Sequence, residues 1–317
     1  MRHLVWLSVC VGLLSAWSSP PALAQGRVVK TDPYEIKPPT QQQLNEARTW
    51  MITMGKQAQQ AAPKLRRIET PYFYLYSAFE TKDDDKRYRD AAERMFSELC
   101  KQFGTNPRTV WVGKCPILAF NDARQYVAFC KAIGFEQGEK SAGLTLIRSD
   151  GMVCIVLNNL RDQTHFYHTM VHEGTHGFMA RFLTKRNLPA WVNEGIAEHM
   201  SARVVEDSPA KALWKEATRQ VLDGERKPES IFDGVALDPF DYGMAHALVR
   251  HMIDKDGKSF SRFVRLLKQG ESEANALKTA YRMDHASLIR DWRANAEKTL
   301  ESAERETEKE NARQTKK

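Results

Sequence analysis

The residues best suited to chemistry are His172, Glu173 and His176, which form the pattern His-Glu-x-x-His. In an α-helix, residues four positions apart lie on the same face, so the two imidazoles can hold one metal ion between them. Glu173 lies about 100° around the helix from His172, because an α-helix has 3.6 residues per turn. Its carboxylate is then expected beside the metal rather than on it, where a general base belongs.

Two further acidic residues, Glu194 and Glu198, are again four positions apart. Two histidines and one glutamate, with a fourth position open, are typical of a catalytic zinc site. We therefore expect Zn²⁺ to be bound by His172, His176 and Glu194. Glu198, one turn later, can accept the remaining N–H of a metal-bound imidazole. The alternative for both glutamates is a solvated acidic face of an amphipathic helix.

Two consecutive helices must position these side chains. The first is expected to begin near Asp162 or Thr164, either of which can cap it, and to end near Leu183. Pro189 suits the first turn of the second helix, which would continue to about Arg203. A short turn between them would let the glutamate face meet the histidine face.

The remaining pattern divides the chain into a strand-containing part and a helical part. The expected strands are 70–79, 110–120, 143–147 and 152–157, and the expected helices are 41–60, 85–103, 122–133, 208–223, 259–269, 271–283 and 284–300. Asp150-Gly151 between the last two strands predicts a hairpin. Strands first and helices afterwards predict an α+β fold, with an N-terminal mixed β-sheet, an active-site helix and a C-terminal helical lobe.

The two motifs together resemble those of the gluzincin metallopeptidases. The motifs are His172-Glu173-x-x-His176 and Trp191-x-Asn193-Glu194-Gly195-x-Ala197. The second is similar to the core of the alanyl aminopeptidases, and a glutamate ligand followed four residues later by an acid is similar to thermolysin-like enzymes. The resemblance covers roughly residues 70–255. It implies a thermolysin-like catalytic fold, zinc on His172, His176 and Glu194, Glu173 as the base, and Glu198 as the partner of a ligand.

Such families also place a Tyr or His of the helical lobe against the oxyanion. The matching stretch contains Tyr242, which we prefer, and His246 as the alternative. Simple packing of that helix is the non-catalytic interpretation of both. His168, one turn before His172, could approach the metal, although a single extra histidine is more often a surface or supporting residue.

The expected activity is hydrolysis of peptide bonds, with water activated by Glu173. The G-x-M-E-N motif that anchors a free amine in the aminopeptidases is absent, so the sequence favours an endopeptidase. The alternative is a catalytically inactive pseudo-peptidase that keeps zinc and acts as a binding module. The expected partner is a peptide or protein substrate. The net charge of +7 is interspersed along the chain, which disfavours nucleic-acid binding.

The chain begins with a stretch typical of a secretory signal. Arg2 and His3 precede an apolar run, and Ala22-Leu23-Ala24 is a cleavage pattern, so we expect an exported, periplasmic or secreted protein. No later apolar run is long enough for membrane insertion after cleavage. The expected organisation is a signal peptide (1–24), a linker and N-terminal helix (25–69), a catalytic domain (70–255), C-terminal helices (256–300) and a charged tail (301–317).

Four cysteines follow the leader. An even number in an oxidising compartment predicts two disulfides, and three pairings are possible. We prefer Cys100–Cys115 and Cys130–Cys154, which join neighbouring helix and strand segments. Four buried free thiols are the alternative.

Overall fold

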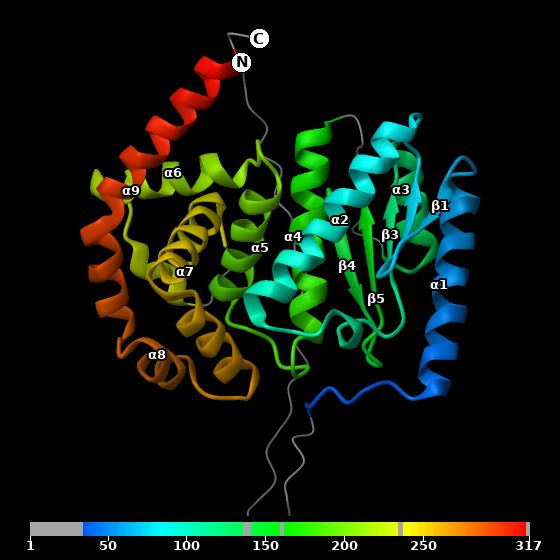
Figure 1. Ribbon diagram of the computed structural model, residues 1–317, viewed down its shortest axis with the longest axis horizontal. Helices are drawn as coiled ribbons and strands as arrows, with labels where there is room; N and C mark the ends of the chain where they lie inside the picture. Colours follow the sequence, from blue (N-terminus) through cyan, green and yellow to red (C-terminus); the bar gives the residue numbers. More distant parts are fainter. Residues whose placement is uncertain (1–33, 136–140, 159–161, 234–236, 315–317) are drawn as a thin grey trace, which may run out of the picture.

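The fold is built on a mixed β-sheet with helices on both faces and a helical lobe beside it (Figure 1). The computed structural model describes residues 34–135, 141–158, 162–233 and 237–314, so the expected signal peptide lies outside the described residues. Among the described residues, the strands of the sheet are followed in sequence by helices, which confirms the α+β expectation. Within the described part of the chain, no helix combines the length and apolar character needed to cross a membrane.

The sheet has five strands in the order β1-β2-β3-β5-β4. The strands are β1 (Arg66–Glu69), β2 (Phe73–Ser77), β3 (Cys115–Ala119), β4 (Gly143–Ile147) and β5 (Val153–Leu157). The three inner strands run parallel, while β1 and β4 are antiparallel to their neighbours at the two edges. The hairpin of β4 and β5 across Asp150-Gly151 is confirmed.

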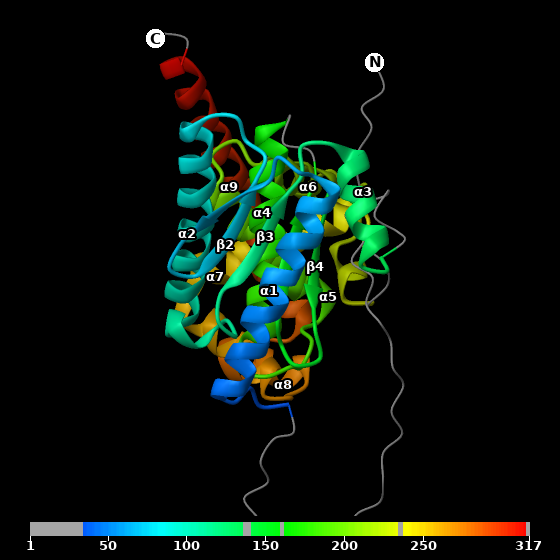
Figure 2. The same cartoon turned by 90° about the vertical axis from the view of Figure 1, so that its right-hand side faces the viewer.

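Both faces of the sheet are buried because successive residues of the inner strands enter opposite cores. Ile117 and Ile155 face one core, whereas Leu118 and Val156 face the other. The helices of this part are α1 (Gln41–Ala61), α2 (Lys82–Phe103), α3 (Ala123–Ala132) and α4 (Gln163–Arg181). Helices α1 and α3 cover one face, and α2 and α4 cover the other (Figures 1 and 2). Such double coverage is typical of parallel strands, which read as continuous apolar runs.

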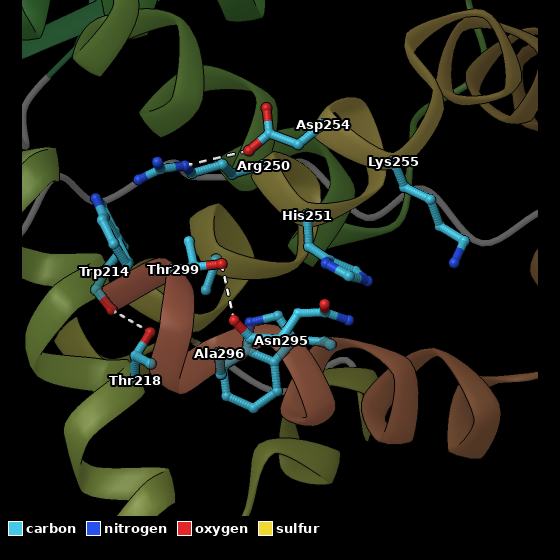
Figure 3. Close-up of a pocket in the computed structure, with 11 residues that line it drawn as sticks. Trp214, Thr218, Arg250, His251, Asp254, Lys255, Asn295, Ala296 and Thr299 are labelled. Carbon is cyan, nitrogen blue, oxygen red and sulfur yellow. Dashed lines mark hydrogen bonds and ion pairs between the residues drawn. The ribbon is translucent and has the colours of Figure 1, made fainter. Parts of the chain in front are cut away.

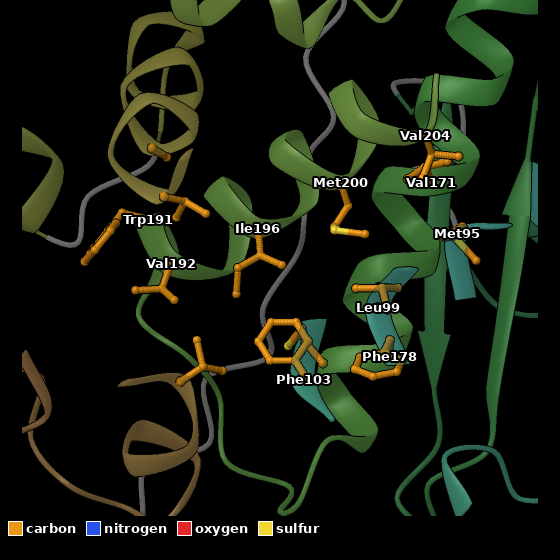
Figure 4. Packing of buried hydrophobic residues seen from close by; sticks show 14 of the residues in the cluster. Met95, Leu99, Phe103, Val171, Phe178, Trp191, Val192, Ile196, Met200 and Val204 are labelled. Atoms are coloured by element: carbon orange, nitrogen blue, oxygen red, sulfur yellow. The ribbon is translucent and has the colours of Figure 1, made fainter. Parts of the chain in front are cut away.

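The helical lobe packs on the outer side of α4. It comprises α5 (Ala190–Val204), α6 (Ala210–Leu222), α7 (Pro239–Lys268), α8 (Glu273–Tyr281) and α9 (His285–Gln314). Figure 4 shows Ile196 and Met200 of α5 on the side of the apolar side chains of α2 and α4, and Val192 belongs to the same buried cluster. The lobe therefore shares one continuous hydrophobic core with the sheet.

Several elements differ from the sequence expectations. Strand β1 lies within the segment expected as linker and helix, and it pairs with β2. The expected strand 110–120 shortens to β3, because a 3-10 turn at Pro107–Thr109 and a loop precede it. Helix α7 begins 20 residues before the expected helix 259–269 and has a kink at Asp256. Pro189 immediately precedes α5 rather than lying in its first turn.

The expectation of two disulfides is wrong for this structure. Cys100, Cys115, Cys130 and Cys154 are free and buried. Each expected pair does share one core, since Cys100 and Cys115 lie on the α4 side and Cys130 and Cys154 on the α1 side. Shared burial does not bring two sulfur atoms to bonding distance, however. Burial raises the pKa of Cys100 and Cys130 to about 11, so these thiols stay protonated near neutral pH.

Candidate metal centre

Helix α4 runs through the middle of the molecule, between the sheet and the helical lobe (Figure 1). It begins after Asp162, whose side chain accepts a hydrogen bond from the backbone N–H of His165. Almost every residue from Thr169 to Phe182 is buried, which agrees with a helix that has no solvated face. His172 and His176 therefore lie inside the protein, on the side of α4 that meets α5.

The ligand atoms expected from the sequence converge there. His172 Nε2 lies 3.0 Å from His176 Nε2 and 3.2 Å from Glu194 Oε2, and the last two atoms are 3.3 Å apart. The three residues are only 3%, 7% and 5% exposed. Tetrahedral zinc with bonds of about 2.0–2.1 Å requires ligand atoms about 3.3 Å apart. The observed triangle therefore has the size that a zinc ion requires.

The state of Glu194 also fits a bound cation. Its buried Oε2 accepts no hydrogen bond of acceptable geometry, although both imidazoles are in ion-pair range. A buried carboxylate oxygen without a hydrogen bond is costly, and a metal ion would satisfy it. The three residues could thus hold a metal ion, in agreement with the chemistry of the donor set.

The electrostatics of the site point the same way. Burial alone would lower the pKa of His172, but its close contacts with the Glu194 and Glu198 carboxylates outweigh burial and raise this pKa to about 10. Burial opposes ionisation of Glu194, yet the positive charges and close contacts of the two histidines hold its pKa well below the usual value. The carboxylates therefore attract positive charge to this point. A divalent cation can replace the protons, which leave when metal binds.

A second polar residue contacts Nδ1 of each imidazole, on the side of the ring away from the other ligands. Glu198 Oε1 lies 3.0 Å from His172 Nδ1. The amide of Asn193 lies 2.9 Å from His176 Nδ1, and a half-turn of the amide lets its oxygen accept the imidazole N–H. In metal sites, such partners fix the tautomer and orient the imidazole ring. The sequence predicts this role for Glu198 but not for Asn193, although Asn193 directly precedes Glu194 in the motif.

Glu173 is 2% exposed and lies against the sheet. Its Oε2 accepts a hydrogen bond of 2.7 Å from Thr145 Oγ1, in the edge strand β4. The sequence does not predict this contact, because nothing in the strand pattern 143–147 marks Thr145 as a partner of the glutamate.

The two candidates for the oxyanion lie in different places. Tyr242, in the first turn of α7, has its ring centroid 6.3 Å from that of His172. His246, one turn later, is buried against α6, with Nδ1 3.3 Å from the carbonyl oxygen of Ala210. Its position favours packing over chemistry at the metal. His168 Nε2 is 3.9 Å from Glu198 Oε1, so His168 extends the group of residues behind His172.

A separate cavity of about 290 Å³ lies in the helical lobe between α6, α7 and α9 (Figure 3). Several of its polar residues already have partners: His251 and Lys255 both contact Asp291, which lies outside the cavity lining, and Thr218 donates to the carbonyl oxygen of Trp214. Arg250 stacks on the ring of Trp214. This cavity therefore does not bring three potential ligand atoms together as the His172 site does.

No protein-family model matches the chain, and a search of curated proteins returns no match. The resemblance to gluzincins thus rests on the motif residues themselves.

Proposed function

We propose that this chain is an exported zinc-dependent peptidase that cleaves internal peptide bonds. The observation that supports the proposal is the triangle of three buried ligand atoms with sides of 3.0–3.3 Å. Two of them belong to His172 and His176 on one face of α4, and the third belongs to Glu194 on α5. His172, His176 and Glu194 would hold the ion. Zinc, when bound, would polarise the carbonyl group of a peptide bond and make water more acidic.

The chain's own residues supply the proton transfers. Glu173 Oε2 takes a proton from the attacking water and delivers it to the nitrogen of the leaving amine. Burial of Glu173 keeps bulk water from competing for that proton. Tyr242 donates its phenolic O–H to the oxygen that becomes negative during the attack. Glu198 and Asn193 keep the two imidazole rings in one orientation during the reaction.

The position of β4 supports an extended peptide as the substrate. This strand is the last of the sheet, and Thr145 at its centre contacts Glu173. An extended peptide can add to such an edge through main-chain hydrogen bonds. The sequence of β4 and β5 contains no G-x-M-E-N motif, which supports cleavage within a chain rather than at a free N-terminus. The signal-like residues 1–24 support export.

The test combines metal analysis with a cleavage profile. Wild type and Glu173→Gln are each loaded with zinc, assayed by elemental analysis, and incubated with a complex peptide mixture. We expect one zinc per chain in both proteins and a loss of about 10²–10⁴-fold in cleavage for Glu173→Gln, the range for a general base. Glu216→Gln, an exposed residue of α6, is the matched control and should cleave at the wild-type rate.

Two outcomes would refute the proposal. Zinc at one per chain without any Glu173-dependent product would favour the inactive binding module. Failure of wild type to bind zinc, with Glu194→Gln behaving identically, would remove the metal site itself.

A further inference from the structure

The hydroxyl of Thr145 lies 2.7 Å from two oxygen atoms of the same residue, Oε2 and the backbone carbonyl oxygen of Glu173. A carbonyl oxygen only accepts hydrogen bonds, and so does an ionised carboxylate. Thr145 must therefore be the donor to either. We propose that Thr145 is a positioning residue, whose hydroxyl holds the Glu173 carboxylate in one orientation and ties it to the edge strand β4.

The placement of Thr145 uses both branches of its side chain. A Cβ placed on Gly177 would lie 3.6 Å from Thr145 Cγ2, so the methyl group rests over the turn of α4 that follows Glu173. The hydroxyl contacts Glu173. Valine at this position keeps the methyl contact and loses the donor, whereas serine keeps the donor and loses the methyl group. The two substitutions therefore separate packing from hydrogen bonding.

The strand itself is rigidly placed. Thr145 pairs with Ile155 of β5, and α4 packs across both strands. Because the Thr145 hydroxyl is on this strand, it gives the Glu173 carboxylate a defined position relative to a peptide bound along the edge of β4. Without the hydroxyl, the carboxylate of Glu173 can turn about its side-chain torsions, and a displacement of about 1 Å can cost as much as 10²-fold in rate.

The kinetic consequence rests on the proposed peptidase function. With a peptide that wild type cleaves and Glu173→Gln does not, we expect Thr145→Val to lower kcat by about 10–100-fold with KM nearly unchanged. Thr145→Ser should recover kcat to within a few-fold of wild type. Thr218→Val, which removes a buried hydroxyl that bonds only its own helix, is the matched control. Equal kcat values for Thr145→Val and Thr218→Val, or no recovery with serine, would overturn the inference.

A second readout needs no substrate. Melting temperatures of the metal-free wild type, Thr145→Val, Glu173→Met and the double variant form a double-mutant cycle. If the two side chains are bonded, the double variant melts at a clearly higher temperature than the sum of the two single losses predicts. Additive losses overturn the inference whether or not cleavage is found. Non-additive losses without Glu173-dependent cleavage support the contact and refute the peptidase proposal instead.

Discussion

Lys268, at the end of α7, links the end of α4 to the turn between α4 and α5, and the pH dependence of this contact can be tested. Its side chain is buried, with the residue 1% exposed, and Nζ donates to the carbonyl oxygens of Met179 (2.8 Å) and Arg186 (2.5 Å). Burial lowers the pKa of Lys268 to about 7, and the nearby cation of Arg186 adds to the effect. A neutral amine has two N–H donors, which match the two carbonyl acceptors.

The sign of the pH dependence follows from this lowered pKa. Between about pH 7 and the unfolded pKa of about 10.4, the unfolded chain holds a proton on Lys268 that the folded protein lacks. The free energy of unfolding should therefore rise with pH across this window, by up to about 1.4 kcal/mol per pH unit. Below pH 7 both states are protonated, so the full cost of burying the charge persists there.

The assay is urea unfolding of wild type and Lys268→Met at pH 7, 8 and 9. Methionine does not titrate. The slope of the unfolding free energy against pH should therefore be larger for wild type than for Lys268→Met, by up to about 1.4 kcal/mol per pH unit. Every other group that titrates, including the histidines of the candidate metal centre, contributes equally to both curves. Parallel curves for the two proteins would refute the reasoning, because Lys268 would then have the same pKa in both states.

The remaining predictions concern α5. Gly195→Ala would place a Cβ 2.5 Å from the backbone oxygen of Ala245, which cannot move aside as a side chain could, so we expect a loss of about 1–3 kcal/mol in urea unfolding. Gly257→Ala, where a Cβ meets only Gln102 Nε2 at 3.8 Å, is the matched control, and equal stability of the two variants would contradict the close approach. Glu198→Gln should weaken zinc binding by about 10–100-fold in competition with a chromophoric chelator, since Glu198 orients His172. Unchanged affinity would show that Glu198 does not support the ligand.

The local elements of the site follow from short-range rules. The spacing of His172 and His176 puts both rings on one helix face whatever surrounds the helix, and Asp162 caps its start through contacts within one turn. Asp150-Gly151 determines the hairpin in the same way. These features depend on residues a few positions apart, so the sequence alone was enough to predict them.

The contacts between distant segments depend on how helices and strands pack, which periodicity does not encode. Thr145 is 28 residues from Glu173, and Lys268 is 89 residues from Met179. Likewise, the four buried cysteines are free, because the packing of helices and strands decides whether two sulfur atoms reach bonding distance. The sequence by itself determined which residues can bind a metal. Only the tertiary structure decided which groups hold those residues in place, because it brings separate segments to hydrogen-bonding distance.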